Sequence, residues 1–452
     1  MPDHRPNILI ICTDQQHWRM MSCAGNPHVH TPAMDRLAAV GTRFERVYCA
    51  NPVCVPSRFT MFTGHMPSAI DMRGITVPHA GEPLPTYIER GGLGWLLQRA
   101  GYRCLYGGKQ HLPRTTAEKL GFEIVTIDER DQLADTCADI VRRPLAEPFC
   151  LVGSFVNPHD ICYMAIGDSL QSESERKLWQ QASTERAALE DALKRPADVD
   201  DDATFFTQHC PPLPPNFEPQ TDEPEAITHL LADRPFRVRA RRAWSEQRWR
   251  EHRWAYARLT ESVDRQIGRV VDALDESSPQ RDTVIIFLSD HGDMDAAHRM
   301  EHKSTFYEEA ARVPLIVRDP SGASVGQVND RDVVSAGLDL IPTCCDYAGI
   351  DPPAELEGRS LRPLIEGRLL DPPRCAVKLE CQIARAVITR RYKYVRCDEG
   401  AHAEQLYDLE ADPHETRNAA DDAAQQDALI EHRALFDEMF DVKTNASVPR
   451  TH

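Results

Sequence analysis

Three short apolar runs divide the chain, and each of them ends abruptly in polar residues. The runs occupy residues 7–13, 149–155 and 284–289 and contain no charged side chain. A continuous apolar run of this length is typical of a strand that is buried on both faces of a parallel sheet. In α/β sheets of this kind, functional groups gather where the strands reach their carboxyl ends. The polar residues after these runs are therefore the first candidates for a functional site.

Helical periodicity lies between the predicted strands. Residues 31–40 and 94–100 carry apolar side chains at helical spacing, and each segment is bounded by a glycine that can end a helix. A longer helix with one apolar face is predicted over residues 252–274. Strands that alternate with helices predict the α/β class: a mixed, mostly parallel central sheet with helices on both faces.

A cluster of tryptophans and arginines lies around the start of the long predicted helix. Trp244, Trp249 and Trp254 are interleaved with basic residues, a pattern that can mark a nucleic-acid-binding surface. The spacing of the tryptophans fits no single helical stripe, whereas the helix itself has an ordinary core face. We therefore favour packing of this helix on the sheet, and nucleic-acid binding is the alternative.

The last part of the chain changes from helical periodicity to alternation. Short alternating segments predict a small antiparallel sheet, which a terminal helix follows. The predicted strands are residues 376–379, 385–389, 392–396 and 405–409. They place a smaller α+β subdomain with an antiparallel sheet at the C-terminal end.

The domain organisation follows from these segments and from proline-rich stretches between them. We predict a catalytic domain over residues 1–365 and the C-terminal subdomain over residues 366–452. Residues 165–235 are polar, acidic and rich in proline, and we interpret them as an insertion in the catalytic domain. We expect this insertion to lie near the mouth of the substrate pocket.

Composition narrows the class of protein. The chain has 452 residues and a formal net charge of −18, which argues against non-specific nucleic-acid binding. No apolar run reaches the length of a membrane span, and the first residues do not read as a signal peptide. The 14 cysteines follow no repeating spacing and fit free, packed thiols in a reducing compartment. We therefore expect a cytoplasmic protein with no membrane partner.

Candidate metal ligands follow two of the apolar runs. Asp14 and Gln15 come directly after the first run, and Asp290 and His291 come directly after the last. Oxygen-rich ligation with one imidazole suits a hard divalent ion, with Ca²⁺ as the first expectation and Mn²⁺ or Mg²⁺ as alternatives. A single aspartate after a strand is usually a loop or cap residue, but two strands with such ends in one chain favour a metal site.

The run Cys54-Val55-Pro56-Ser57-Arg58 is the most specific motif in the sequence. It opens a short predicted helix that ends at Gly64, and a nucleophile at a helix N-terminus gains from the dipole and from free backbone N–H groups. Arg58 could steady an anion bound there. The alternative is an ordinary buried thiol and a surface arginine.

Basic side chains elsewhere could complete an anion site. Lys109 and His111 lie in a glycine-rich segment after a predicted strand, and Lys303 lies beyond the last apolar run. His159 follows the second apolar run and is a candidate general acid for a leaving oxygen. A lone histidine or lysine in such loops is more often structural or solvated, so these roles depend on the rest of the constellation.

The motifs together resemble type I sulfatases of the alkaline phosphatase superfamily. The similarity covers residues 6–111, 149–163, 252–318 and 385–418. It rests on Cys-Val-Pro-Ser-Arg, on Gly-Lys-Gln-His, on Ser-Asp-His-Gly-Asp-Met and on a C-terminal Leu-Tyr-Asp-Leu-Glu-Ala-Asp-Pro-His-Glu. The resemblance implies an alkaline phosphatase-like α/β/α sandwich and the hydrolysis of a sulfate ester.

The resemblance also implies a role for each candidate residue. Cys54 would be oxidised to formylglycine by a formylglycine-generating enzyme, and the hydrated aldehyde would be both nucleophile and metal ligand. The metal would be held by Asp14, Asp290 and His291, with Gln15 beside them. The remaining implied roles are sulfate binding by Lys109 and Lys303, contacts with the diol from Arg58 and His111, and protonation of the leaving group by His159.

Two positions depart from the common sulfatase pattern. Gln15 stands where many members have a second aspartate, and His291 stands where many have asparagine. This pairing looks more like the branch that contains choline sulfatases and phosphonate monoester hydrolases. Our first expectation is a sulfated carbohydrate or another small organic sulfate. The alternatives are a phosphonate monoester or phosphodiester hydrolase, or an unconverted protein that only binds anions or glycans. A homo-oligomer is left open.

Overall fold

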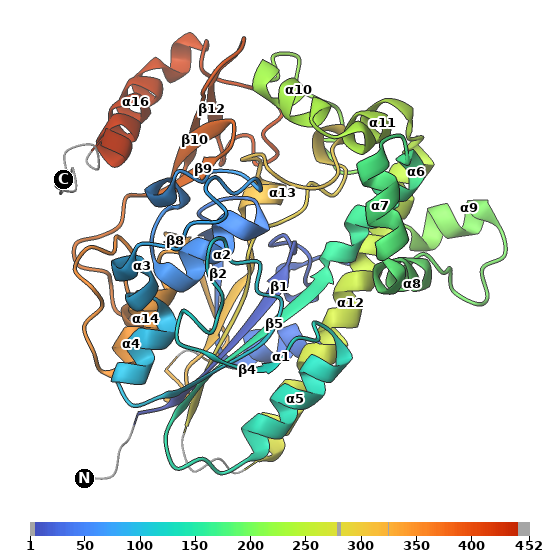
Figure 1. Ribbon diagram of the computed structural model, residues 1–452. Coiled ribbons are helices and arrows are strands. Elements are labelled where there is room, and N and C mark those ends of the chain that lie inside the picture. The colour runs from blue at the N-terminus through green and yellow to red at the C-terminus, as the bar shows by residue number, and fades with distance from the viewer. Residues whose placement is uncertain (1–4, 278–281, 324, 442–452) are drawn as a thin grey trace.

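The computed structural model describes residues 5–277, 282–323 and 325–441. In these residues an eight-stranded sheet forms the centre, and a separate four-stranded sheet lies towards the C-terminal end (Figure 1). The strand order of the central sheet is β4-β3-β5-β1-β6-β7-β2-β8. In that order the strands are Glu123–Thr126, Arg103–Gly108, Phe149–Pro158, Asn7–Asp14, Thr283–Ser289, Leu315–Arg318, Thr42–Tyr48 and Gln327–Ser335.

The three apolar runs become the three adjacent strands β5, β1 and β6. Strand β1 is parallel to both neighbours, with Asp14 beside Pro158 and Thr13 beside Ser289. Strand β7 runs antiparallel to β6 and β2, which makes the sheet mixed. The predicted α/β fold with a mostly parallel central sheet is therefore confirmed, and the ends of β1, β5 and β6 meet at one edge.

Two hydrophobic layers cover the sheet because side chains of its strands point alternately to opposite faces. Ile8 and Ile10 of β1 pack with one layer of helices, whereas Leu9 and Ile11 pack with the other. The first layer contains α2 Cys54–Thr63, α4 Leu93–Arg99, α14 Leu340–Ala348 and α15 Arg362–Ile365, with α3 Thr86–Arg90 nearby. The second contains α1 Pro32–Val40, α5 Asp131–Arg142 and α12 Glu246–Glu276.

Helix α12 is the longest of the described helices and corrects one prediction. It begins at Glu246 rather than at residue 252, because the Ser245 side chain caps it by accepting a hydrogen bond from the Arg248 N–H. Trp249 and Trp254 are consequently helical and buried, at 1% and 5% exposure, so packing rather than nucleic-acid binding accounts for them. Among the described helices, none is both long and apolar enough to cross a membrane.

The segment predicted as an insertion is mostly helical rather than irregular. Its helices gather on one side of the molecule, beside the upper part of α12 (Figure 1). They are α6 Cys162–Ser169, α7 Glu173–Gln181, α8 Ser183–Ala192, α9 Asp202–Thr204, α10 Glu225–Ala232 and α11 Pro235–Ala243. Helix α11 contacts α6, which ties the two ends of the segment together.

The C-terminal sheet confirms the predicted antiparallel alternation. Its strands are β9 Ala376–Cys381, β10 Ala384–Thr389, β11 Tyr392–Cys397 and β12 Glu404–Asp408, and α16 Gln426–Asp441 covers one face. The other face packs against the catalytic part, where α13 Glu308–Ala311 lies. The buried Lys393 of β11 binds Glu308 at 2.8 Å and Glu415 at 2.7 Å across this contact. The domain boundary at residue 365 stays a prediction.

Candidate active site

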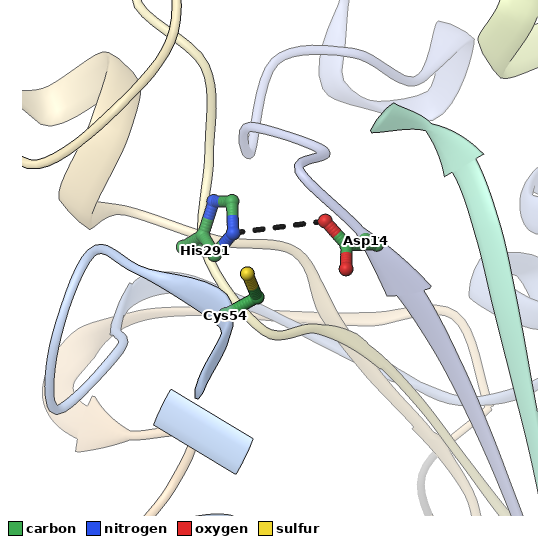
Figure 2. Close-up of side chains that lie close together, drawn as sticks. All are labelled: Asp14, Cys54 and His291. Carbon is green, nitrogen blue, oxygen red and sulfur yellow. Dashed lines mark ion pairs between the residues drawn. The ribbon is translucent and has the colours of Figure 1, made fainter. Parts of the chain in front are cut away.

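Two strand ends and one helix start bring the central groups of the site together. Asp14 ends β1, and Asp290 and His291 follow β6, its parallel neighbour. Cys54 is the first residue of α2 and points between them (Figure 2). Asp14, Asp290 and His291 have no exposed surface, and Cys54 is 1% exposed. One ligand atom each from Cys54, Asp14 and His291 lies within 4.8 Å of the others.

The hydrogen bonds of His291 orient its ring as a ligand. Its Nδ1 donates to the Gly292 carbonyl at 2.8 Å, so Nε2 carries the free lone pair. Nε2 lies 3.6 Å from Asp14 Oδ1 and 3.6 Å from Asp290 Oδ1. Figure 2 shows the imidazole facing the Asp14 carboxylate over the Cys54 sulfur.

These atoms fit a divalent cation. Asp14 Oδ1 and His291 Nε2 are buried without a hydrogen-bond partner, which is costly for polar atoms unless another group binds there. Burial and the neighbouring Asp14 charge raise the pKa of Asp290, and a cation between the two carboxylates would relieve that repulsion. Carboxylate oxygens with one imidazole nitrogen are the donors expected for a hard or borderline divalent ion.

Gln15 lies beside the cluster but its amide points to other partners. Its Nε2 donates to Asp293 Oδ2 at 2.6 Å and lies 3.0 Å from Cys162 Sγ, and its Oε1 accepts from Lys303 Nζ at 2.7 Å. Its backbone has a φ of 69°, in the left-handed region. Gln15 therefore positions Lys303 in the structure, and its place among the metal ligands stays a prediction.

Two lysines bring positive charge to the cluster around Cys54. Lys109 Nζ lies 2.6 Å from Asp14 Oδ2, and Lys303 Nζ lies 3.9 Å from Cys54 Sγ. Burial alone would raise the pKa of the Cys54 thiol, but the charge of Lys303 and the neighbouring His111 and His291 bring it well below its ordinary value. The site thus stabilises negative charge at position 54.

Arg58 lies behind the carboxylates rather than beside the nucleophile. Its guanidinium is fully buried and donates to Asp290 Oδ2 at 2.8 Å, Ser154 Oγ at 2.6 Å and the Lys109 carbonyl at 3.0 Å. A longer contact of 3.4 Å reaches Asp14 Oδ2. These contacts make Arg58 a support that orients the carboxylates, whereas its predicted contact with the diol stays a prediction.

The two predicted histidines line the cavity that opens above Cys54. His111 is exposed and adopts a φ of 44°, whereas His159 is half-buried. Burial, Lys109 and Lys303 together hold the pKa of His159 well below its ordinary value, so its imidazole is neutral before an anion binds. A bound sulfate would place a negative charge beside this ring and favour its protonated form.

The cavity has a volume of about 710 Å³, within the range of small-molecule sites. Its floor contains Cys54 and Lys303, and its wall is built largely from the helical insertion. The wall residues from this region are Cys162, Tyr163, Ile166, Ser172, Ser174, Glu175, Leu178, Asp233, Arg234, Pro235, Phe236 and Arg237. The expectation that residues 165–235 contribute to the pocket agrees with this lining.

Several supporting residues were missed by the sequence reasoning. Asp293 holds the Gln15 amide, and the Tyr256 hydroxyl donates to the Gln15 carbonyl at 2.6 Å. Ser154 of β5 accepts from Arg58. Asp293 belongs to the quoted Ser-Asp-His-Gly-Asp-Met motif and could have been selected. Tyr256 and Ser154 carry no sequence signal, because an ordinary helix and an ordinary strand supply them.

Comparison with known protein families identifies the class to which the chain belongs. Residues 6–350 match the family described as Sulfatase, and residues 296–441 match the family described as N-sulphoglucosamine sulphohydrolase, C-terminal. The chain therefore belongs to the sulfatase family of the alkaline phosphatase superfamily. As a member of that family it is a sulfuric ester hydrolase, and the resemblance predicted from the motifs is confirmed.

Individual relatives cover nearly the whole chain. A Δ4,5-hexuronate-2-O-sulfatase of Bacteroides thetaiotaomicron is 29% identical, over 96% of this chain and 88% of the relative. A choline-sulfatase of Rhizobium meliloti is 26% identical, over 93% and 83%. The solved structure of a 2-O GAG sulfatase superposes with a TM-score of 0.82 at 28% identity, over 97% of this chain and 93% of that one. The phosphonate monoester hydrolase of Agrobacterium radiobacter shares the fold, with a TM-score of 0.71 at 22% identity over 96% and 95%.

Proposed function

We propose that this protein hydrolyses the sulfate ester of a sulfated saccharide, with a nucleophile made from Cys54 by conversion to formylglycine. The observation that carries the proposal is the convergence of Cys54, Asp14 and His291 within 4.8 Å, with Lys303 Nζ 3.9 Å from the sulfur. The positive charge and the two orphaned ligand atoms are what an oxygen nucleophile bound to a metal requires.

Formylglycine would supply a hydrated aldehyde, in which one hydroxyl attacks sulfur and the other allows release of the sulfate without a separate hydrolysis step. The residues around it have separate tasks. Lys109 and Lys303 offset the charge of the sulfate oxygens, and Arg58 holds the two carboxylates in place. His159 lines the same cavity and would donate a proton to the leaving oxygen once the anion has raised its pKa.

The metal would be held by Asp14, Asp290, His291 and residue 54, and it would polarise the sulfate and acidify the nucleophilic hydroxyl. We keep Ca²⁺ as the first candidate, because carboxylate oxygens dominate the donor set. The single imidazole and the neutral Gln15 also suit Mn²⁺ or Mg²⁺. Metal analysis of the purified protein separates these candidates.

A saccharide substrate is supported by the relatives. One is named for a hexuronate 2-O-sulfate and another is an N-acetylglucosamine-6-O-sulfatase. The cavity is large enough for a sugar and has serine, glutamate and arginine side chains in its wall. We take a 2-O-sulfated sugar as the first substrate to try.

Maturation and location belong to the same proposal. Conversion of Cys54 requires a formylglycine-generating enzyme as a partner during synthesis. All 14 cysteines are free, 12 of them buried, which supports a reducing and therefore cytoplasmic location. The oligomeric state stays open.

The test is a substrate screen on converted, metal-loaded protein. The chain is co-expressed with a formylglycine-generating enzyme and assayed on an aryl sulfate, on 2-O-sulfated and 6-O-sulfated sugars, and on an aryl phosphonate with the same leaving group. We expect turnover of sulfates that Cys54→Ala abolishes. Turnover of the phosphonate alone would favour the phosphonate monoester hydrolase alternative. A protein that binds sulfated sugars without hydrolysing any substrate would contradict the enzymatic proposal.

A further inference from the structure

The cavity wall contains a buried cation that the sulfate chemistry does not use. Arg237 lies in α11, is 9% exposed, and lines the same cavity as Cys54 and Lys303. Its Nε has no hydrogen-bond partner, and its one recorded hydrogen bond is a long one of 3.4 Å from Nη1 to the Leu230 carbonyl. Among the residues that the structure describes, no carboxylate lies within 4.0 Å of it.

Arg58 is a buried arginine whose positive charge is compensated by carboxylates, and it serves as a comparison for Arg237. Its guanidinium binds Asp290 at 2.8 Å and contacts Asp14 at 3.4 Å, and these carboxylates raise its pKa despite burial. Burial lowers the pKa of Arg237 instead. An uncompensated buried charge is expensive, so it is kept where a ligand supplies the missing partner.

The charged neighbours of Arg237 do not supply that partner. The carboxyl groups of Glu301 and Asp233 raise the pKa of Arg237, and the charge of Arg234 lowers it. Burial raises the pKa of Glu301 to about 8, so this acid is largely protonated at neutral pH. The N–H of Phe236 at the start of α11 is already used, because it donates to Glu175 Oε1 at 2.9 Å.

The position of Arg237 relates it to the sulfate site. His302 lies next to Lys303 in the chain, and both Lys303 and Arg237 lower its pKa, after the larger effect of burial. Phe236 packs edge-on against the His302 ring at 5.9 Å between centroids. Arg237 on the wall and Lys303 on the floor therefore line one cavity together with His302, and a ligand that fills this cavity can reach both cations.

We propose that Arg237 binds a second anionic group of the substrate, a carboxylate or a second sulfate on the sugar that carries the scissile ester. A guanidinium presents paired N–H groups that match a planar carboxylate or two sulfate oxygens. This inference rests on the proposed function and narrows it to sulfated sugars with two anionic groups.

The test compares three matched substrates on the converted, metal-loaded enzyme. They are a 2-O-sulfated hexuronate glycoside, the 2-O-sulfated hexoside that lacks the carboxylate, and that hexoside with a second sulfate ester on its C6 hydroxyl. We expect wild-type kcat/KM to be at least about tenfold higher for one or both dianionic sugars than for the monoanionic one. The better of the two identifies the second group.

Variants on α11 assign the preference to Arg237. Arg237→Gln should lower the ratio of dianionic to monoanionic kcat/KM at least about tenfold, and Arg237→Lys should give an intermediate ratio. Arg239→Gln is the matched control, because Arg239 is exposed on the same helix and outside the cavity wall. It should leave the ratio unchanged.

Two results would overturn the inference, and they are distinguishable from failure of the proposed function. Equal wild-type kcat/KM for the three sugars contradicts it without any variant. The same ratio in Arg237→Gln and Arg239→Gln contradicts it as well. If neither the sugars nor an aryl sulfate is turned over by converted enzyme, the proposed function itself fails, and the inference with it.

Discussion

The floor and the wall of the cavity are built in different ways. Beneath the floor, which contains Cys54 and Lys303, the groups Asp14, Asp290 and His291 follow two central parallel strands and have no exposed surface. The wall comes from short helices of the insertion, where Ser172 and Arg234 face the opening. Central strands hold ligand atoms with little freedom, whereas short surface helices can vary without disturbing the sheet. We therefore expect the floor to supply the chemistry and the wall to select the substrate.

The largest effect is expected at residue 54. Cys54→Ala removes the nucleophile and should lower kcat/KM on an aryl sulfate by at least about 10⁴-fold. Because the side chain is small, the melting temperature should change little. Cys375→Ala, at an exposed free cysteine, is the control and should keep full activity. Retention of more than a few per cent of the activity in Cys54→Ala would show that hydrolysis does not depend on residue 54.

Removal of a metal ligand should have the next largest effect. His291→Ala takes away the imidazole that faces Asp14 and Asp290. Loss of bound metal should cost about 4 kcal/mol of transition-state stabilisation, or about 10³-fold in kcat/KM. Metal content measured with activity checks this, and His79→Ala at an exposed histidine serves as control. Full metal content with low activity would argue against His291 as a ligand.

Lys303 tests the floor without removing the metal. Lys303→Met keeps the length of the side chain but removes the charge 3.9 Å from residue 54. We expect kcat to fall about 10²-fold, the range seen when one donor to a developing anion is lost. Lys119→Met, at an exposed lysine, should behave as wild type. An unchanged kcat in Lys303→Met would contradict the anion-binding role.

Glu301 precedes the cavity-lining His302 in the chain and tests whether burial of an acid near the wall costs stability. Its folded pKa of about 8 lies above the unfolded value, so the folded protein keeps a proton that the unfolded chain releases. The associated stability is present below pH about 4.5 and is lost as the pH rises towards 8, by about 4 kcal/mol. Glu301→Gln should therefore flatten the decline between pH 5 and pH 8 in denaturant unfolding. Parallel profiles for the two proteins would contradict this assignment.

The smallest effect is expected at the edge of the wall. Ser172 caps α7 by accepting from the Glu175 N–H, and the Glu175 carboxylate in turn accepts a hydrogen bond from the Ser172 N–H. Ser172→Ala should cost about 1 kcal/mol of unfolding free energy. Because the wall selects the substrate, KM for a sulfated sugar should rise more than kcat falls. A fall in kcat with an unchanged KM would contradict the expectation that the wall acts on substrate binding rather than on the reaction.

The floor could be predicted from the sequence because its signals are local. A buried parallel strand has a recognisable apolar run, and adjacent parallel strands end at one edge, so Asp14 and Asp290 were expected to meet. Cys54 opens a specific motif at a helix start. The fold class follows from the same runs.

The sequence predicted that residues 165–235 lie near the pocket mouth, but the roles of single wall residues could not be predicted, because they depend on tertiary contacts. Among the described residues, Arg237 combines burial with the lack of a carboxylate partner, which no one-dimensional pattern reveals. The orientation of the Gln15 amide likewise depends on Asp293 and Lys303. The start of α12 at Glu246 was missed because Trp249 and Trp254 are five residues apart and do not follow a helical apolar pattern.

The most direct test of the account is the mass of the peptide that contains residue 54, measured together with activity. Preparations made with increasing amounts of a formylglycine-generating enzyme are compared at equal metal content. Formylglycine is about 18 Da lighter than cysteine, and we predict that sulfatase activity rises in proportion to the lighter peptide. Full activity in a preparation whose peptide carries only the unmodified thiol would contradict the central claim.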